Sequence, residues 1–188
     1  MMVTGWAVED DIAEVLISAD EIQRRVSELG KAISEDYEGL EPRLIGILKG
    51  VTPFMADLLR AISVPVSVDF MAIAKYDPKV ETRSLVRLLK DLDLSITGKH
   101  VLLIEDIIDS GLTMEYILDI LQAREPASLK VCTLFNKPGR RVVDLQLDYV
   151  GFDLPDVFVV GYGLDYEQKY RNLPYLALLK PEIYEGHH

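Results

Sequence analysis

The stretch VLLIEDIIDSGLTMEYIL, residues 101–118, decides how the rest of the chain is interpreted. Four apolar residues lead directly into three carboxylates, Glu105, Asp106 and Asp109, and a Ser-Gly turn then opens a helical pattern. In an open parallel sheet, ligands bind beyond the carboxyl ends of the strands, so a buried strand would deliver these acids to a binding edge. The free N–H groups at the start of the helix suit a phosphate, and Gly111 would let the backbone approach it closely. We therefore expect a ligand with a phosphate at one end and hydroxyl groups or Mg²⁺ at the other, as in ribose 5-phosphate.

The local spacing also leaves a plain alternative open, because a solvated strand-to-helix turn with an Asp or Ser cap is common. Two other phosphate-binding patterns do not fit the chain. GILKGVT, residues 46–52, has the wrong spacing for a Walker A loop and lacks its Lys-Ser/Thr pair. GYGLDY, residues 161–166, lacks the third glycine of the dinucleotide-binding fingerprint.

Composition limits the class of protein. The chain has 188 residues, 49% of them hydrophobic and 27% charged, as is usual for one globular domain. The formal net charge of −11 disfavours nucleic-acid binding, although local cations, backbone donors or Mg²⁺ can still hold an anionic small molecule. No apolar run approaches the length of a membrane span, and the N-terminus lacks the features of a signal peptide, so we expect a cytoplasmic protein. The single cysteine, Cys132, excludes an intrachain disulfide and is expected to be a buried strand residue.

The remaining pattern predicts alternating helices and strands. A capping-box pattern at Ser18 and Glu21 opens a first helix, whose apolar residues recur at helical spacing. Further helices are predicted from the Thr-Pro pair at 52–53 through 62 and over 114–123. Strands are predicted over 43–48, 64–74, 101–106, 129–135, 157–163 and 175–180, with another soon after residue 84. The polar segment 75–84 has no periodicity and is predicted to be a mobile loop.

This alternation predicts an α/β fold in which a mostly parallel, twisted sheet is flanked by helices on both faces. We expect a single domain over residues 1–188. Its core would span about 40–165, and a small hood would be built from about 1–39 and 166–186.

VLLIEDIIDSGLT resembles the phosphoribosyl pyrophosphate signature of the type I phosphoribosyltransferases. Other segments resemble the purine-salvage branch of that family, which acts on 6-oxopurines: LIGILKGVTPFMADLLRAI (44–62), VDFMAIAKY (68–76) and VGFDLPDVFVVGYGLDYEQKYRNLPY (150–175). Enzymes of that branch transfer the phosphoribosyl group of phosphoribosyl pyrophosphate to N9 of hypoxanthine or guanine. They use Mg²⁺ and release pyrophosphate together with IMP or GMP. The resemblance implies the type I phosphoribosyltransferase fold, the same reaction and a homodimer or homotetramer.

The resemblance also implies roles within the signature. Glu105 and Asp106 would hold the ribose hydroxyls, directly and through Mg²⁺, and Asp109 would be the catalytic acid/base group that faces N7 of the purine. The 5′-phosphate would be wrapped by the next four residues, Ser110, Gly111, Leu112 and Thr113. Leu112 stands where some relatives carry lysine, so the phosphate would depend on backbone and hydroxyl donors.

Pyrophosphate, in the same comparison, would bind the backbone at Lys49 and Gly50, with a cis peptide between Leu48 and Lys49, and the side chain of Arg171. Catalysis in the family depends on positioning and charge stabilisation rather than on a covalent nucleophile. The presence of only three histidines, two of them at the C-terminus, agrees with that chemistry.

The purine, on this resemblance, would be recognised by residues after the signature. Lys137 would donate to the exocyclic O6, Phe158 would stack on the ring and the backbone of Val159 would read its edge. Asp165 would bind a second Mg²⁺. Taken alone, Phe158 and Val159 are typical of a buried strand and Lys137 of a solvated turn.

Residues 75–84 resemble the long loop that closes over the site in this family and excludes water. Lys75 and Tyr76 replace the usual Ser-Tyr pair at its start, so Tyr76 can still cap the site.

Three alternatives remain in view. One is a phosphoribosyltransferase that prefers xanthine, since the base-site residues do not select among 6-oxopurines. Another is a nucleotide-sensing regulator on the same fold that binds RNA or DNA, which the acidic charge disfavours. The last is a phosphoacceptor receiver domain. In such a domain the acidic pair follows the first strand, whereas in this chain the acids come after about a hundred residues.

Overall fold

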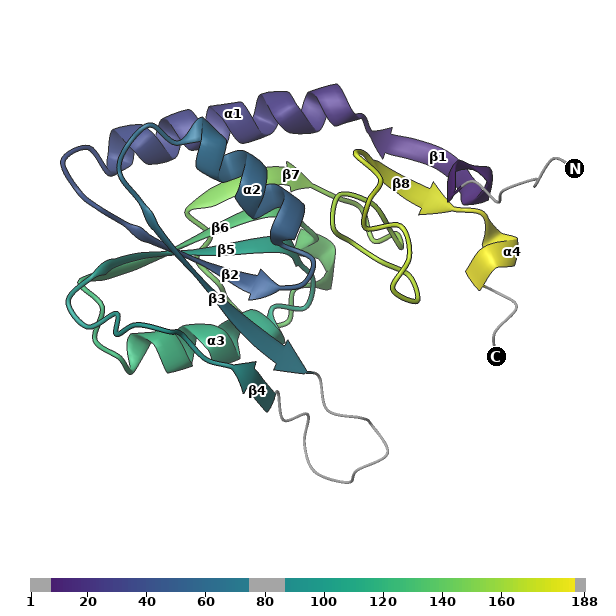
Figure 1. Ribbon diagram of the computed structural model, residues 1–188. Helices are drawn as coiled ribbons and strands as arrows, with labels where there is room; N and C mark the ends of the chain where they lie inside the picture. Colours follow the sequence, from purple (N-terminus) through teal and green to yellow (C-terminus); the bar gives the residue numbers. More distant parts are fainter. Residues whose placement is uncertain (1–7, 75–86, 185–188) are drawn as a thin grey trace, which may run out of the picture.

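The computed structural model describes residues 8–74 and 87–184, and a six-stranded sheet forms its centre (Figure 1). Five strands are parallel to their neighbours, and one edge strand, β4, runs antiparallel to β3. The prediction of a mostly parallel sheet is therefore confirmed. In spatial order the strands are β4 (Arg87–Lys90), β3 (Ser67–Ala74), β2 (Arg43–Leu48), β5 (His100–Ile108), β6 (Ser128–Asn136) and β7 (Tyr149–Asp153).

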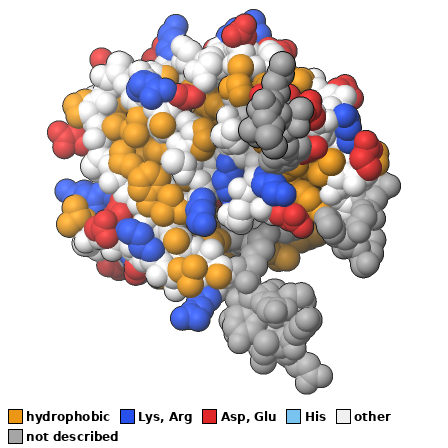
Figure 2. Space-filling view, turned by 45° about the vertical axis from the view of Figure 1, so that its right-hand side comes forward, with side chains coloured by type: hydrophobic (Ala, Val, Ile, Leu, Met, Phe, Trp, Pro, Cys, Tyr) orange, Lys and Arg blue, Asp and Glu red, His pale blue; other side chains and the backbone are white. Residues whose placement is uncertain are grey.

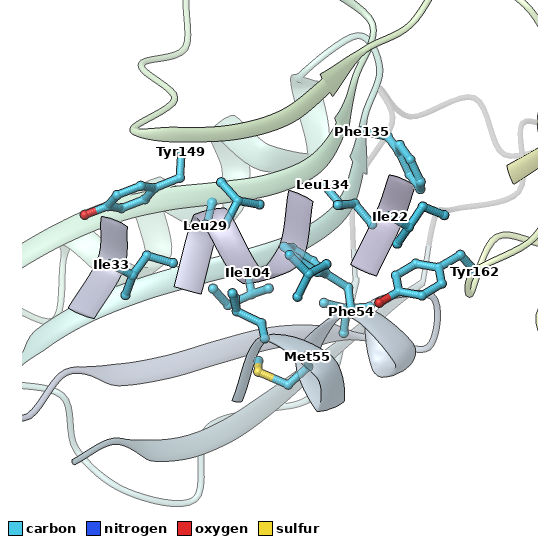
Figure 3. Close-up of a cluster of buried hydrophobic side chains, with 14 of the residues drawn as sticks. Ile22, Leu29, Ile33, Phe54, Met55, Ile104, Leu134, Phe135, Tyr149 and Tyr162 are labelled. Carbon is cyan, nitrogen blue, oxygen red and sulfur yellow. The ribbon is translucent and has the colours of Figure 1, made fainter. Parts of the chain in front are cut away.

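Helices cover both faces of this sheet, as predicted. Figure 1 shows α1 (Ala19–Asp36) and α2 (Thr52–Ala61) on one face and α3 (Leu112–Gln122) on the other. The first helix begins with the predicted capping box, because the Ser18 hydroxyl accepts the Glu21 N–H at 3.3 Å and the Glu21 carboxylate accepts the Ser18 N–H at 2.9 Å. Its apolar residues Ile22, Val26, Leu29 and Ile33 are all buried. They pack with α2 and the sheet in the cluster of Figure 3.

A second, two-stranded sheet pairs the two ends of the chain. Strands β1 (Ile12–Ile17) and β8 (Leu176–Leu179) run antiparallel, with the short helices η1 (Val8–Asp11) and α4 (Pro181–Tyr184) beside them. We call these four elements the hood. Figure 1 shows the hood beyond the end of the main sheet to which the β2 arrow points.

The hood is smaller than the sequence predicted. Helix α1, which was assigned to it, packs against α2 and β7 and shares the main apolar core. The predicted boundary near residue 39 is therefore wrong for this helix, and the change of direction lies at Ser18. The reason is that the apolar stripe of α1 is wide enough to cover the sheet face beside α2.

The strand predicted over 157–163 is also wrong. This segment makes only two isolated bridges, Val160 to Ala177 and Gly161 to Leu164, and the last strand of the main sheet is β7 instead. Two glycines at 161 and 163 have φ near +100°, a conformation that interrupts a strand. Its buried apolar residues pack without a hydrogen-bonded ladder: Val159 and Tyr162 lie in the main core, and Val160 lies in the cluster shared with the hood.

The strand order reverses between β2 and β5. From β2 the chain crosses through α2 to β3 on one side, and from β5 it crosses through α3 to β6 on the other. The ladder between β2 and β5 comprises four pairs and ends at Gly46 and Ile104, although each strand continues beside its outer neighbour. The strands therefore part at their carboxyl ends, which is where open α/β sheets bind ligands.

No helix in residues 8–74 and 87–184 is long and apolar enough to cross a membrane. Cys132 is fully buried on β6, as expected.

Candidate active site

A cavity of about 610 Å³ lies where β2 and β5 part. Its wall is formed by the turn after β2, by the end of β5 with the start of α3, and by the loops that follow β6 and β7. Of the predicted site residues that the structure describes, all except Leu112 line it: Lys49, Gly50, Glu105, Asp106, Asp109, Ser110, Gly111, Thr113, Lys137, Phe158, Val159, Asp165 and Arg171. Lys75 and Tyr76 lie outside the described residues. On the face that Figure 2 turns forward, acidic and basic side chains are interspersed with apolar ones.

The turn from β5 into α3 has the geometry of an anion site. Gly111 precedes the helix with φ +89°, and the first helical N–H bond is the one from Glu115 back to the Gly111 carbonyl, so the N–H groups of the first turn remain free of helical partners. A Cβ on Gly111 would lie 2.7 Å from a methyl group of Val143, and the positive φ would strain any other residue, so glycine is favoured there. Ser110 and Thr113, which carry hydroxyl groups, line the same cavity.

Leu112 lies in this turn, but it does not line the cavity. Its side chain is 51% exposed and does not line the wall. One position on a helix rotates a side chain by about 100°, so consecutive residues of the turn cannot all face one ligand. Only the backbone of Leu112 can contribute to binding.

Asp106 is the most deeply placed acid of the site, with 8% of its surface exposed. Its Oδ1 accepts the Ile107 N–H at 2.9 Å. Burial raises the pKa of Asp106, and hydrogen bonds from backbone N–H groups and the charge of Arg171 act in the opposite direction. Gly50 packs directly on this carboxylate, since a Cβ at Gly50 would lie 1.8 Å from Asp106 Oδ2. The pyrophosphate-loop candidate and the acid pair are thus in contact.

Asp109 also lines the cavity. Its Oδ2 is 3.2 Å from the Arg140 guanidinium, which also reaches Asp156 at 3.2 Å. Its other oxygen, Oδ1, is buried and accepts no hydrogen bond from the described residues. Arg140 and Asp156 both line the cavity and were missed by the sequence analysis. They stand in polar connections, where a charged residue carries no sign of its partner.

Lys137 is 6% exposed although it is charged. Its ammonium donates to the Val157 carbonyl at 2.6 Å, and its backbone N–H donates to Ile108 at 2.9 Å. The alternative of a solvated turn residue is excluded for Lys137, because a lysine so deeply buried must be held by acceptors. The ammonium is therefore placed beside the cavity as a charged donor.

The side chains of Phe158 and Val159 lie in different environments. Phe158 is 48% exposed and meets the Tyr166 ring edge to face, with ring centroids 5.9 Å apart, whereas Val159 is buried in the main core. An exposed aromatic face over a cavity with a buried ammonium can accept a flat ring that carries a hydrogen-bond acceptor.

Arg171 and Asp165 form an ion pair across the loop that follows β7. Arg171 Nη2 is 2.6 Å from Asp165 Oδ1, and Nη1 donates to the Gly163 carbonyl at 2.7 Å. On the facing wall, the Leu48–Lys49 peptide is cis, as the family resemblance implied.

No group of three or more His, Cys, Asp and Glu side chains within 8–74 and 87–184 is arranged to hold a metal ion. Glu105, Asp106 and Asp165 therefore do not form one protein-only metal site. Mg²⁺ is commonly held by one or two carboxylates together with substrate phosphates and water, and the adjacent acids Glu105 and Asp106 fit that kind of site.

Comparison with known proteins gives one family throughout. Residues 18–167 match the family model described as a phosphoribosyl transferase domain. The hypoxanthine-guanine phosphoribosyltransferase of Bacillus subtilis is 48% identical over 179 residues, which cover 95% of this chain and 99% of that protein. The bifunctional protein TilS/HprT of Listeria monocytogenes is 48% identical over 178 residues, and the chain spans 28% of its length.

The fold comparison agrees. The crystal structure of a hypoxanthine phosphoribosyltransferase from Staphylococcus aureus superposes with a TM-score of 0.90 at 45% identity, covering 96% of this chain and 98% of that one. The chain therefore belongs to the phosphoribosyltransferase family, and within it to the hypoxanthine-guanine phosphoribosyltransferases.

Proposed function

We propose that the protein transfers the 5-phosphoribosyl group of phosphoribosyl pyrophosphate to N9 of hypoxanthine or guanine, giving IMP or GMP and pyrophosphate. One observation carries the proposal. A single cavity unites a helix N-terminus suited to phosphate, an acid pair suited to ribose hydroxyls, and a buried lysine beside an exposed aromatic ring. Together these groups supply one partner each for the phosphate, the sugar and the base of a nucleotide.

The phosphate end is held by the turn at Ser110 to Thr113. Backbone N–H groups and two hydroxyls supply the donors there, and the positive end of the α3 dipole favours the anion. Fixing the phosphate in this turn places the ribose over Glu105 and Asp106. The bound sugar is thereby oriented before reaction, which lowers the entropic part of the barrier.

Asp109 is the proposed acid/base group. As N9 bonds to the anomeric carbon and pyrophosphate departs, the purine loses a proton, and a carboxylate near N7 can accept it. Asp109 Oδ1 is free among the described residues to do so, while Arg140 holds the other oxygen in place. The neighbouring acids also stabilise the positive charge that grows on the ribose.

Base choice rests on Lys137. Its ammonium donates to O6 of hypoxanthine or guanine, whereas adenine presents an amino group that cannot accept. Because the lysine is buried, a base that offers no acceptor leaves a charged donor poorly paired and is strongly disfavoured. Phe158 stacks on the ring from the exposed side.

Mg²⁺ is the proposed cofactor, held by Glu105 and Asp106 and, for a second ion, by Asp165. Bound there, it would neutralise charge on pyrophosphate and so improve it as a leaving group. Lys49, the backbone at Gly50 and Arg171 would contact the pyrophosphate itself, with Arg171 exchanging its bond to Asp165 for the phosphate oxygens.

A cytoplasmic location remains a prediction from the sequence composition, and a homodimer or homotetramer remains a prediction from the family resemblance. Light scattering coupled to gel filtration measures the oligomeric state.

The function is tested by incubating the protein with Mg²⁺, phosphoribosyl pyrophosphate and each of hypoxanthine, guanine, xanthine and adenine, and following nucleotide formation. We expect turnover with the first two and none with adenine. A preference for xanthine would redirect the proposal to another base, and no turnover with any base would favour the regulator.

A further inference from the structure

Asp57 on α2 connects three parts of the molecule. Its carboxylate accepts a hydrogen bond from the Gln23 amide on α1 at 2.7 Å and from the Tyr162 hydroxyl at 2.6 Å, and it is paired with Arg60. Tyr162 belongs to the loop beneath the hood and is only 4% exposed. Figure 3 shows its ring in the main buried cluster, with the hydroxyl directed towards Phe54 of α2. Burial and the charge of Asp57 raise the pKa of Tyr162, so the hydroxyl remains a donor.

Tyr162 lies in a turn where its backbone has an unfavourable conformation. Its φ is +46°, between Gly161 at +100° and Gly163 at +99°. A side chain is unfavourable in this left-handed region, where glycine and asparagine are the usual residues. A tyrosine is therefore placed there at a cost in backbone energy, and its hydroxyl bond to Asp57 offsets that cost.

The same turn contacts the segment that follows β2, which also lines the cavity. A Cβ on Gly163 would lie 1.9 Å from the Gly50 carbonyl, so the two backbones touch without room for a methyl group. Gly50 follows Lys49, and α2, which carries Asp57, begins two residues later at Thr52. Lys49 and Gly50 line the cavity, and so do Leu164 and Asp165, the next two residues after Gly163. The Tyr162–Asp57 bond therefore ties two walls of the cavity together.

We propose that Tyr162 and Asp57 are positioning residues for the pyrophosphate end of the site. Their hydrogen bond fixes the spacing between Gly50 and Gly163, and with it the direction in which Lys49 and Arg171 face the leaving group. Neither side chain lines the cavity, so both act through the backbone they hold. This inference rests on the proposed function, because it assigns one end of the cavity to pyrophosphate.

The chain supplies a matched control. Tyr149 donates to Asp36 at 2.5 Å and, like Tyr162, is a buried tyrosine of the main core. Neither Tyr149 nor Asp36 lines the cavity. Tyr149→Phe therefore removes the same hydroxyl from the same kind of pair without touching either wall of the site.

The experiment compares Tyr162→Phe, Asp57→Asn and Tyr149→Phe with the wild-type chain. Melting temperature, kcat and the KM values for phosphoribosyl pyrophosphate and hypoxanthine are measured for each. We expect Tyr162→Phe to raise KM for phosphoribosyl pyrophosphate about tenfold, as loss of one hydrogen bond to a charged group predicts, while KM for hypoxanthine stays near its wild-type value. Asp57→Asn should change KM in the same direction. Tyr149→Phe should lower the melting temperature and leave both KM values unchanged.

Pyrophosphate binding in the presence of Mg²⁺, measured by calorimetry, gives a second readout that needs no base. The inference is overturned if Tyr162→Phe and Tyr149→Phe lower the melting temperature alike and neither changes KM or pyrophosphate affinity. It is also overturned if Tyr162→Phe weakens hypoxanthine and phosphoribosyl pyrophosphate equally. A wild-type chain that binds pyrophosphate but turns over no base would refute the proposed function alone. The positioning role would then be judged on the pyrophosphate affinities, and failure of the wild-type chain to bind pyrophosphate would overturn it.

Discussion

Replacing Gly50 with alanine forces a methyl group into the shortest contact that a Cβ would make at any described glycine. The new atom would lie 1.8 Å from Asp106 Oδ2, whereas real Cβ atoms essentially never come closer than 3.0 Å to a neighbour. The carboxylate or the loop must therefore move by at least about 1 Å. Asp106 is buried and cannot swing freely into solvent. A displacement of that size in a group that positions the substrate costs about 100-fold in rate, or about 2.7 kcal/mol of transition-state stabilisation.

The assay is steady-state kinetics of IMP formation, with melting temperature measured in parallel. We expect kcat/KM for phosphoribosyl pyrophosphate to fall about 100-fold in Gly50→Ala, and overpacking to cost about 1–3 kcal/mol of stability. Gly139→Ala is the control, because a Cβ there meets nothing within 4 Å and the residue is not in the left-handed region. A Gly50→Ala enzyme with wild-type kinetics would refute the claim that this contact sets the position of Asp106.

Three further substitutions test separate parts of the site. Asp109→Asn should slow the chemical step about 10²- to 10⁴-fold, as loss of an acid/base group does, and a variant with normal single-turnover rates would remove Asp109 from that role. Lys137→Met should lower kcat/KM for hypoxanthine and guanine about 10- to 150-fold without changing KM for phosphoribosyl pyrophosphate, and an equal loss for both substrates would argue against base recognition. Burial raises the pKa of Asp106, so the folded state binds its proton more readily than the unfolded chain does, and the carboxylate lowers stability as pH rises above about 4 and through the folded pKa. Asp106→Asn should therefore melt at a higher temperature than the wild type at pH 7 and lose that advantage near pH 4, while its activity falls. Scanning calorimetry between these pH values checks this, and an Asn variant that melts lower at pH 7 would contradict it.

Local signals were enough to predict much of the fold. The capping box at Ser18 and the helical stripe that follows it act within a few residues, and both are confirmed. The run from apolar strand to acids to Ser-Gly turn likewise depends on neighbouring residues, and it ends at the cavity as expected. The strand predicted over 157–163 was wrong because an apolar pattern detects burial, and Val159 and Val160 are buried in two different clusters without pairing to the main sheet.

The features that sequence could not predict are contacts between distant segments. Arg140 meets Asp109 across 31 positions, and Tyr162 meets Asp57 across 105. No spacing rule extends so far, and each residue alone looks like an ordinary surface charge or core aromatic. The orientation of the Leu112 side chain could not be predicted for a different reason. A signature identifies the turn but not which of its side chains faces the ligand.

The early end of the ladder between β2 and β5 has a consequence for mechanics. The two halves of the sheet are joined by only four rungs, from Arg43 opposite Val101 to Gly46 opposite Ile104. Phosphoribosyl pyrophosphate bound in the gap would contact Lys49 on one half through its pyrophosphate and Glu105 on the other through its ribose, and would link the two strands where the ladder is missing. Bound substrate should therefore hold the two halves of the sheet together. Backbone amides on both sides of the gap should then exchange with deuterium more slowly in the presence of substrate than in its absence.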